Sequence, residues 1–257
     1  MNLFRVWAPK AKKVELEVRT QRLPMSAAEN GWWFSEITSA QPSTDYAFVL
    51  DGGKPLPDPR SPWQPHGIHG PSRTVDHGAF QWTDRHWQPG PLSAAVFYEL
   101  HIGTFTPAGT FKSAIEKLDH LVRLGITHVE LMPVAEFSGN RGWGYDGVYL
   151  YAPHHAYGEP DDLKRLVDAC HARGLAVVLD VVYNHLGPAG NYLDRFGPYF
   201  TDRYATPWGT AVNLDGPFSD EVRRFFCDNA LMWLRDYHFD GLRLDAVHAI
   251  VDTSASH

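Results

Sequence analysis

The sequence has little cysteine, no block of basic residues and no long apolar run. Its two cysteines, Cys170 and Cys227, lie in segments with helical apolar periodicity, so we expect two buried thiols and no disulfide framework. No apolar stretch approaches the length of a membrane span, and the first ten residues, MNLFRVWAPK, lack the pattern of a secretory signal. These absences favour a cytoplasmic protein with no membrane partner.

Positive charge is also scarce. The 257 residues include 23 Lys or Arg and 30 Asp or Glu, which gives a formal net charge of −7. Proteins that bind nucleic acid usually carry a basic stripe, so the composition argues against nucleic acid and favours a neutral substrate over an anionic one. Hydrophobic residues make up 44% of the chain, which is typical of a folded globular protein of one or two domains.

Residues 1–88 have the periodicity of β-strands. Val14, Leu16 and Val18 alternate with charged residues, which predicts a half-buried strand. Further short strands are expected at 32–34 and 46–50, and Asp51-Gly52-Gly53 predicts a turn. We therefore predict a small antiparallel β-sandwich over residues 1–88. Residues 88–91, Gln-Pro-Gly-Pro, have the composition of a linker.

Residues 89–257 change to alternating strands and helices. We expect strands at 95–100, 127–132, 175–182 and 241–247, and helices at 112–124, 161–173 and 219–237. Ser219 is the expected N-cap of the last helix. The apolar residues expected to face inward are Ile115, Leu118, Leu121 and Val122 on the first helix, and Val222, Phe226, Trp233 and Leu234 on the last.

Four βα units in series imply a parallel sheet with right-handed crossovers. A doubly wound sheet and a TIM barrel both fit this pattern. Polar residues gather after each strand, as in barrel enzymes, and no Gly-rich phosphate loop follows the first strand. The expected fold is an antiparallel β-sandwich followed by the first half, four βα units, of an α/β TIM barrel. We expect residues 89–257 to be a partial barrel, truncated after strand 4.

Arg243 and Asp245 are the strongest candidates for chemistry. They lie two residues apart on the strand at 241–247, so their side chains point to one face, while Leu242 and Leu244 point to the other. An arginine beside an aspartate keeps the carboxylate ionised at neutral pH. An ionised, oriented carboxylate suits the nucleophile of a retaining glycosidase. A structural ion pair that locks a barrel is the alternative.

His185 follows the strand at 175–182, in the segment Asp180-Val-Val-Tyr-Asn184-His185. A neutral histidine there can hydrogen-bond a sugar hydroxyl, although a histidine satisfied by loop carbonyls is the commoner arrangement. Asp180 and Asn184 are expected to hold the loop. We predict no metal site, because the spacing of these residues matches no known ligand motif.

A loop after the second strand, Arg141-Gly-Trp143-Gly-Tyr145-Asp146-Gly147, places two aromatic rings among glycines. Glycines permit a tight loop that presents its rings outward. Stacking of a ring on a sugar is the functional interpretation, and a packed loop plug is the structural one.

These segments together resemble the α-amylase family of glycoside hydrolases. Asp180 to His185 and Gly241 to His248 are similar to its third- and fourth-strand signatures, and Gly142 to Asp146 to its loop with a stacking tyrosine. The opening Phe4-Arg-Val-Trp-Ala-Pro9 resembles the β-sandwich that precedes the barrel in some members. Within the family, the segments 98–107, 184–192 and 207–213 resemble members that release trehalose.

The resemblance implies a role for each candidate residue. Asp245 would form a covalent glycosyl-enzyme intermediate, and Arg243 would orient it. His185 would bond a hydroxyl of the sugar before the cut, with Tyr145 stacked on that sugar and His248 beyond the cut. Trp143 and Asp146 are expected substrate contacts on the same loop as Tyr145. The bond hydrolysed would be the α-1,4 link next to a terminal trehalose unit of a malto-oligosaccharide, with no cofactor.

In this family the general acid is a glutamate after the fifth strand, and a His-Asp pair follows the seventh. The sequence ends before both, so we expect the 257-residue chain to be inactive by itself. A glycogen branching or debranching enzyme is the alternative within the family. A non-catalytic carbohydrate-binding protein is the alternative from another class.

Overall fold

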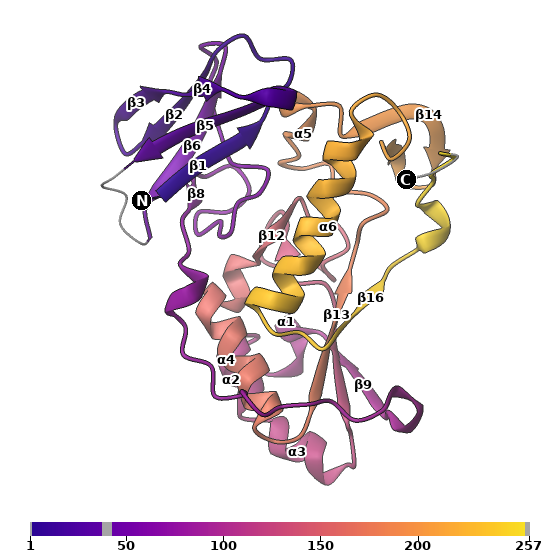
Figure 1. Cartoon of the computed structure of the whole chain (residues 1–257). Coiled ribbons are helices and arrows are strands. Elements are labelled where there is room, and N and C mark those ends of the chain that lie inside the picture. Colours follow the sequence, from indigo (N-terminus) through magenta and orange to yellow (C-terminus); the bar gives the residue numbers. More distant parts are fainter. Residues whose placement is uncertain (1, 38–42, 255–257) are drawn as a thin grey trace.

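The computed structural model describes residues 2–37 and 43–254 (Figure 1). Its first part holds two antiparallel sheets. One has the order β1 (Asn2–Trp7), β5 (Trp32–Ile37), β4 (Ser26–Ala27). The other has the order β3 (Gln21–Pro24), β2 (Val14–Val18), β6 (Asp45–Leu50), β7 (Pro55–Leu56), with β8 (Ser72–Arg73) also on β6. The predicted antiparallel strands are therefore confirmed.

The turn predicted at residues 51–53 is present and has a clear physical cause. Asp51 and Gly52 both adopt positive φ, 50° and 72°, a conformation that glycine and aspartate tolerate better than most residues. The Asp51 carboxylate also accepts hydrogen bonds of 2.8 Å from the backbone N–H groups of Lys12 and Lys13. The side chain thus replaces backbone partners at the end of the sheet.

A four-stranded parallel sheet forms the second part. Its order is β9 (Phe97–Leu100), β10 (His128–Leu131), β13 (Ala176–Val181), β16 (Gly241–Leu244), so neighbours in the chain are neighbours in the sheet. A doubly wound sheet would place its first strand in the interior of the sheet. In the observed order the first strand is the outermost of the four, so these strands are not arranged in that way, and all four carboxyl ends lie on the same side of the sheet.

Three longer helical stretches accompany this sheet, as predicted, but the first is broken. Residues 111–123 form α2 (Phe111–Ile115) and α3 (Leu118–Arg123), with Glu116 and Lys117 between them. The continuous helix predicted at 112–124 is therefore wrong, and the break leaves Val122 42% exposed instead of buried. The other two stretches are α4 (Pro160–His171) and α6 (Ser219–Asp236).

The short helical segments are α1 (Ile102–Phe105), α5 (Leu193–Phe196), η1 (Glu29–Gly31), η2 (His77–Ala79), η3 (Leu92–Ala94), η4 (His155–Tyr157) and η5 (Val247–Ala249). Two antiparallel pairs were not predicted. They are β11 (Ala135–Glu136) with β12 (Tyr149–Pro153), and β14 (Phe200–Thr206) with β15 (Gly209–Val212).

Helix α6 departs from the sequence prediction in three residues. Phe218, in a left-handed conformation at φ 65°, occupies the N-cap position, so Ser219 is the first helical residue and not the cap. Leu234 is 40% exposed, whereas Val222, Phe226 and Trp233 are buried as expected. Cys227 is exposed, so only Cys170 is the buried thiol that the sequence predicted.

Helix α6 lies between the front sheets and the parallel sheet (Figure 1). One continuous hydrophobic cluster runs through both parts and includes Phe4 and Phe48 of the front strands together with Leu131 and Trp233. Polar contacts cross the same seam. The Trp32 indole N–H donates to Glu221 at 3.0 Å, and Arg60 pairs with Asp228 at 2.7 Å. The helix therefore joins two parts of the chain that differ in architecture.

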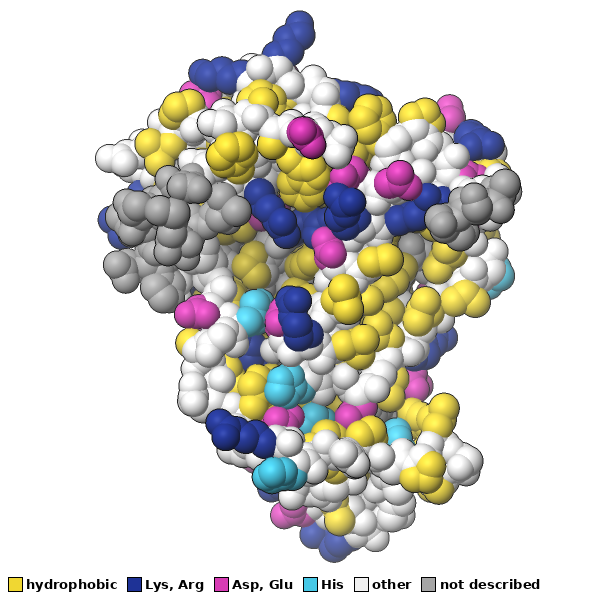
Figure 2. All heavy atoms as spheres, in the orientation of Figure 1, with side chains coloured by type: hydrophobic (Ala, Val, Ile, Leu, Met, Phe, Trp, Pro, Cys, Tyr) yellow, Lys and Arg dark blue, Asp and Glu magenta, His cyan; other side chains and the backbone are white. Residues whose placement is uncertain are grey.

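No helix in the described part of the chain is long and apolar enough to cross a bilayer. On the face drawn in Figure 2, basic and acidic side chains are interspersed, without a continuous basic stripe.

Candidate active site

The parallel sheet has one apolar and one polar face, and the polar face leads to the candidate site. Val129, Leu131, Val177 and Leu179 point to the helix-covered side and are buried. The alternate positions of the four strands carry Glu99, Glu130, Asp180 and Arg243 on the opposite face. These four polar side chains extend along this face to the edge where the carboxyl ends of the strands lie.

Arg243 is the centre of the site. Asp180 and Arg243 are directly opposed in the register of β13 and β16. The Arg243 guanidinium donates to both oxygens of Asp180, at 3.0 and 2.9 Å, and to Asp245 Oδ1 at 2.7 Å. One planar cation therefore orients two carboxylates, as the alternation of side chains along the strand predicted for Arg243 and Asp245.

The two carboxylates differ in their surroundings. Asp180 is 1% exposed, and burial raises its pKa, although Arg243 and the Tyr145 hydroxyl act in the opposite direction. Its oxygens are occupied by Arg243 and by the Tyr145 hydroxyl, which donates at 2.9 Å. Asp245 is half-buried at the open edge. Asp245 is therefore the carboxylate available to a substrate, and Asp180 is the anchor.

The backbone around Asp245 is fixed and then turns sharply. The Asp245 N–H donates to the Val181 carbonyl at 3.0 Å, which extends the strand pairing by one residue. Ala246 then adopts φ 42°, a strained left-handed conformation for a residue with a side chain. Strained residues of this kind are concentrated at functional sites.

The rings of His185 and His248 both lie close to the ring of Trp208, a residue for which we predicted no role. Trp208 lies in the turn of the β14–β15 hairpin and stacks on the His185 ring at 5.1 Å and 12°. Its ring lies 6.2 Å from that of His248. Trp208 is 45% exposed, so it offers part of a flat aromatic face to the open edge of the sheet.

His185 has the properties of a neutral hydrogen-bonding group. Burial lowers its pKa, while the Tyr145 backbone and the Asp146 and Asp245 carboxylates raise it to a smaller extent. Its Nδ1 lies 2.9 Å from the Asn184 side-chain amide, which donates to it. With Nδ1 accepting this bond, the neutral ring carries its proton on Nε2.

Only part of the loop with Trp143, Tyr145 and Asp146 contacts this site. Tyr145 reaches Asp180 through its hydroxyl, and burial raises its pKa, so the phenol keeps its proton. Trp143 is 75% exposed and Asp146 is exposed. The structure therefore brings Tyr145 to the carboxylates, but it leaves the predicted roles of Trp143 and Asp146 as predictions.

Two clusters in the described part of the chain have the residue types of metal ligands. One is Glu99, Glu130 and Asp180, whose third member already binds Arg243. The other is Glu136, His154 and His155.

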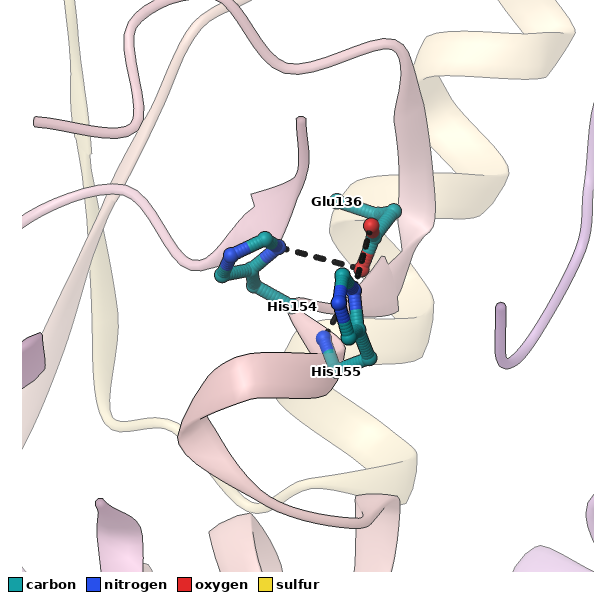
Figure 3. Close-up of side chains that lie close together, drawn as sticks. All are labelled: Glu136, His154 and His155. Atoms are coloured by element: carbon teal, nitrogen blue, oxygen red, sulfur yellow. Dashed lines mark hydrogen bonds and ion pairs between the residues drawn. The ribbon is translucent and has the colours of Figure 1, made fainter. Parts of the chain in front are cut away.

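Figure 3 shows that the Glu136 carboxylate lies between the two imidazoles. It accepts hydrogen bonds from His154 Nδ1, His155 Nδ1 and the His155 backbone N–H, at 3.1, 2.7 and 2.8 Å. These contacts occupy both oxygens of the Glu136 carboxylate and hold the three residues together.

Comparisons with known proteins identify the family of this chain. The profile of the alpha amylase catalytic domain matches residues 73–204, half of the chain. The chain belongs to the α-amylase family.

Individual relatives narrow the comparison. A malto-oligosyltrehalose trehalohydrolase from Arthrobacter ramosus is 57% identical over 99% of this chain and 45% of its own length. A 1,4-alpha-glucan branching enzyme from Vibrio parahaemolyticus is 37% identical over 99% of this chain and 37% of its own length. A crystal structure from Salmonella typhimurium, named as a candidate alpha amylase, has a TM-score of 0.95 and 48% identity, covering 99% of this chain and 43% of that one. The chain thus spans about half the length of the curated relatives it matches.

Proposed function

We propose that this chain provides the front β-sandwich, residues 1–88, and the first four βα units, residues 89–257, of a retaining glycoside hydrolase with a TIM barrel. The observation that carries the proposal is the Asp180–Arg243–Asp245 constellation at the carboxyl edge of the parallel sheet. A retaining glycosidase requires an ionised carboxylate held against the anomeric carbon of its substrate. Asp245 is the only member of the constellation that is both oriented by Arg243 and open to a ligand.

The proposed chemistry has two steps. Asp245 attacks the anomeric carbon, the glycosidic bond breaks, and the departing oxygen takes a proton from a general acid that we do not place among these residues. Water then hydrolyses the glycosyl-Asp245 ester and releases the sugar. Arg243 orients the Asp245 carboxylate, His185 forms a hydrogen bond with a sugar hydroxyl, and Tyr145 holds the reacting sugar by its ring.

We propose malto-oligosyltrehalose as the substrate and trehalose as a product. The support is the 57% identity to a relative named for this activity, against 37% to a branching enzyme. The branching and debranching alternatives are therefore less favoured. Trp208, which bridges His185 and His248, offers a further flat face for a sugar on the far side of the cut. A cytoplasmic location is kept as a prediction.

Product analysis tests the proposal directly. The longest natural chain that contains this sequence is incubated with maltotriosyl trehalose and, separately, with maltopentaose, and the products are resolved by chromatography. We expect trehalose from the first substrate and almost no cleavage of the second. Equal cleavage of both would remove the named activity, and new α-1,6 branches would favour the branching enzyme.

A further inference from the structure

The loop that carries Trp143 and Tyr145 is held near its start, at Gly142, by a histidine that follows strand β9. His101 follows β9, and its Nε2 lies 2.8 Å from the Gly142 carbonyl oxygen. A carbonyl oxygen only accepts hydrogen bonds, so the imidazole must carry its proton on Nε2. His101 therefore donates to the backbone of the loop one residue before Trp143.

Tyr157 reinforces this contact from the opposite side. Its hydroxyl lies 3.0 Å from His101 Nε2 and 3.4 Å from the Gly142 carbonyl, to which it donates. Burial raises the pKa of Tyr157 to about 12, so the donor proton is present throughout the neutral range. The two rings meet edge to face, with centroids 5.8 Å apart.

Two glycines make room for the clamp. A Cβ on Gly103 would lie 2.8 Å from His101 Cε1 and 3.1 Å from Tyr157 Cε1. A Cβ on Gly142 would lie 2.9 Å from the Phe137 ring. Side chains at either position would push the clamp or the loop away, so both positions favour glycine.

The buried cluster of Figure 3 supports Tyr157 from behind. Glu136 binds His154, and the His154 ring packs against that of Tyr157 with centroids 4.8 Å apart. The Tyr157 N–H also donates to the His154 carbonyl at 3.0 Å. His154 is fully buried, so this support has little freedom to move. A continuous set of contacts thus runs from Glu136 to the loop.

We propose that His101 is a positioning residue. It fixes the place of the loop relative to the sheet, so that Tyr145 reaches the reacting sugar. This inference rests on the proposed function, because it assumes that Tyr145 contacts substrate. The loop is tied at its other end by the Tyr145 hydroxyl on Asp180 and by the Gly187 N–H on the Gly147 carbonyl at 3.1 Å. Without His101, the stretch from Gly142 to Tyr145 is restrained at its later end alone, so the Tyr145 ring loses part of the support that fixes its position.

A double-mutant cycle on the longest natural chain tests the proposal. We expect His101→Leu to lower kcat/KM about 10- to 100-fold, because displacements near 1 Å have effects of this size. His101→Gln, whose amide can replace the Nε2 donor, should retain activity within about threefold. In a Tyr145→Ala background, His101→Leu should add little further loss, because the two residues act as one unit. The exposed His86→Leu is the control.

Equal losses from His101→Leu in both backgrounds would overturn the proposal, as would failure of His101→Gln to restore activity. If His101→Leu folds poorly, Tyr157→Phe removes only the hydroxyl and should give a smaller loss with the same dependence on Tyr145.

Hydrogen exchange separates this inference from the proposed function. His101→Leu should accelerate exchange of the amides of residues 142–147 and leave the β14–β15 hairpin unchanged. This readout needs no substrate, so it still applies if no trehalose is released. Unchanged exchange at 142–147 would contradict the positioning role even if the enzyme has the proposed activity.

Discussion

Arg243 has a side chain 43% exposed, yet it holds the buried Asp180 and the open Asp245 together. A guanidinium can do this because its donors are fixed in one plane and it remains charged at every pH of interest. The pKa of Arg243 is raised further, mainly by its hydrogen bonds to Asp180 and Asp245, against the opposing effect of burial. Loss of the Arg243 proton is therefore not a means of switching this site.

Removal of the Asp245 charge should separate binding from chemistry. Asp245→Asn keeps the shape of the side chain but cannot form the glycosyl ester, so we expect kcat to fall by roughly 10³-fold or more. Substrate affinity measured by calorimetry should change far less. Asp220→Asn, on a side chain 88% exposed at the start of α6, is the matched control. Retained turnover in Asp245→Asn would contradict the role of Asp245 as the nucleophile.

His77 should make the fold sensitive to acid. Burial, and next the Lys164 ammonium, lower the pKa of His77 from 6.5 to about 4. The unfolded chain binds this proton more readily than the folded one in that window, so stability present above pH 6.5 is lost as the pH falls to about 4. The loss over this whole window is on the order of 3 kcal/mol.

Urea unfolding at pH 7 and pH 4.5 measures the effect of His77. His77→Leu should lose less stability between these two pH values than the unchanged protein, because it has no proton to take up. The exposed His86→Leu should behave as the unchanged protein does. Parallel pH dependences for all three chains would show that His77 does not carry the effect.

Sequence reasoning succeeded where a residue's direction follows from its own strand. Arg243 and Asp245 were predictable as a pair because side chains alternate along a strand. The stacking of Trp208 on His185 was not predictable, since it depends on how a hairpin 23 residues later folds back. Asp180 was expected to hold its loop, but its partner Arg243 became evident only from the register of two strands.

At the scale of elements, the predictions that failed concern where a helix is interrupted and where a helix begins. The helix predicted at 112–124 had the correct apolar period, but it divides after Ile115, and Leu118 rather than Val122 continues the buried face. Ser219 has the composition of an N-cap, yet the left-handed Phe218 takes that position. In both cases the helix boundary differs from the one that the local residue pattern favours.

The two helix starts provide a matched pair of substitutions. Thr110 caps α2, where its side chain accepts from the Ser113 N–H at 3.2 Å. Thr110→Ala should therefore lower the free energy of unfolding by about 1 kcal/mol. Ser219→Ala should cost less than about 0.5 kcal/mol, because Ser219 caps nothing. Chemical denaturation decides between them, and a larger loss at Ser219 would contradict the assignment of the caps.

For the whole molecule, the seam along α6 determines whether the front sheets and the parallel sheet behave as one unit. Arg60 is its most connected residue. It pairs with Asp228 at 2.7 Å, donates to the Tyr151 hydroxyl at 2.9 Å, and packs over the Trp32 ring. Its side chain is 14% exposed, so these contacts are poorly screened by water.

Substitution of Arg60 should lower the free energy of unfolding more than removal of an exposed ion pair does. Arg60→Met should cost about 1–3 kcal/mol, because the Asp228 carboxylate and the Tyr151 hydroxyl lose a partner. Arg22→Met removes a pair with Glu17 from an arginine 43% exposed and should cost less than about 1 kcal/mol. Calorimetry gives both values, and a single unchanged transition for Arg60→Met would contradict the role of the seam.

The contacts along this seam also have a consequence for the evolution of the chain. Trp32 and Glu221 are 189 positions apart in the chain, and Arg60 and Asp228 are 168 apart, yet each pair is in direct contact. A change at one member alters the fitness of changes at the other. Among descendants of this chain, such pairs should vary together, so the front sheets and helix α6 should be inherited as one unit and should rarely be exchanged by recombination.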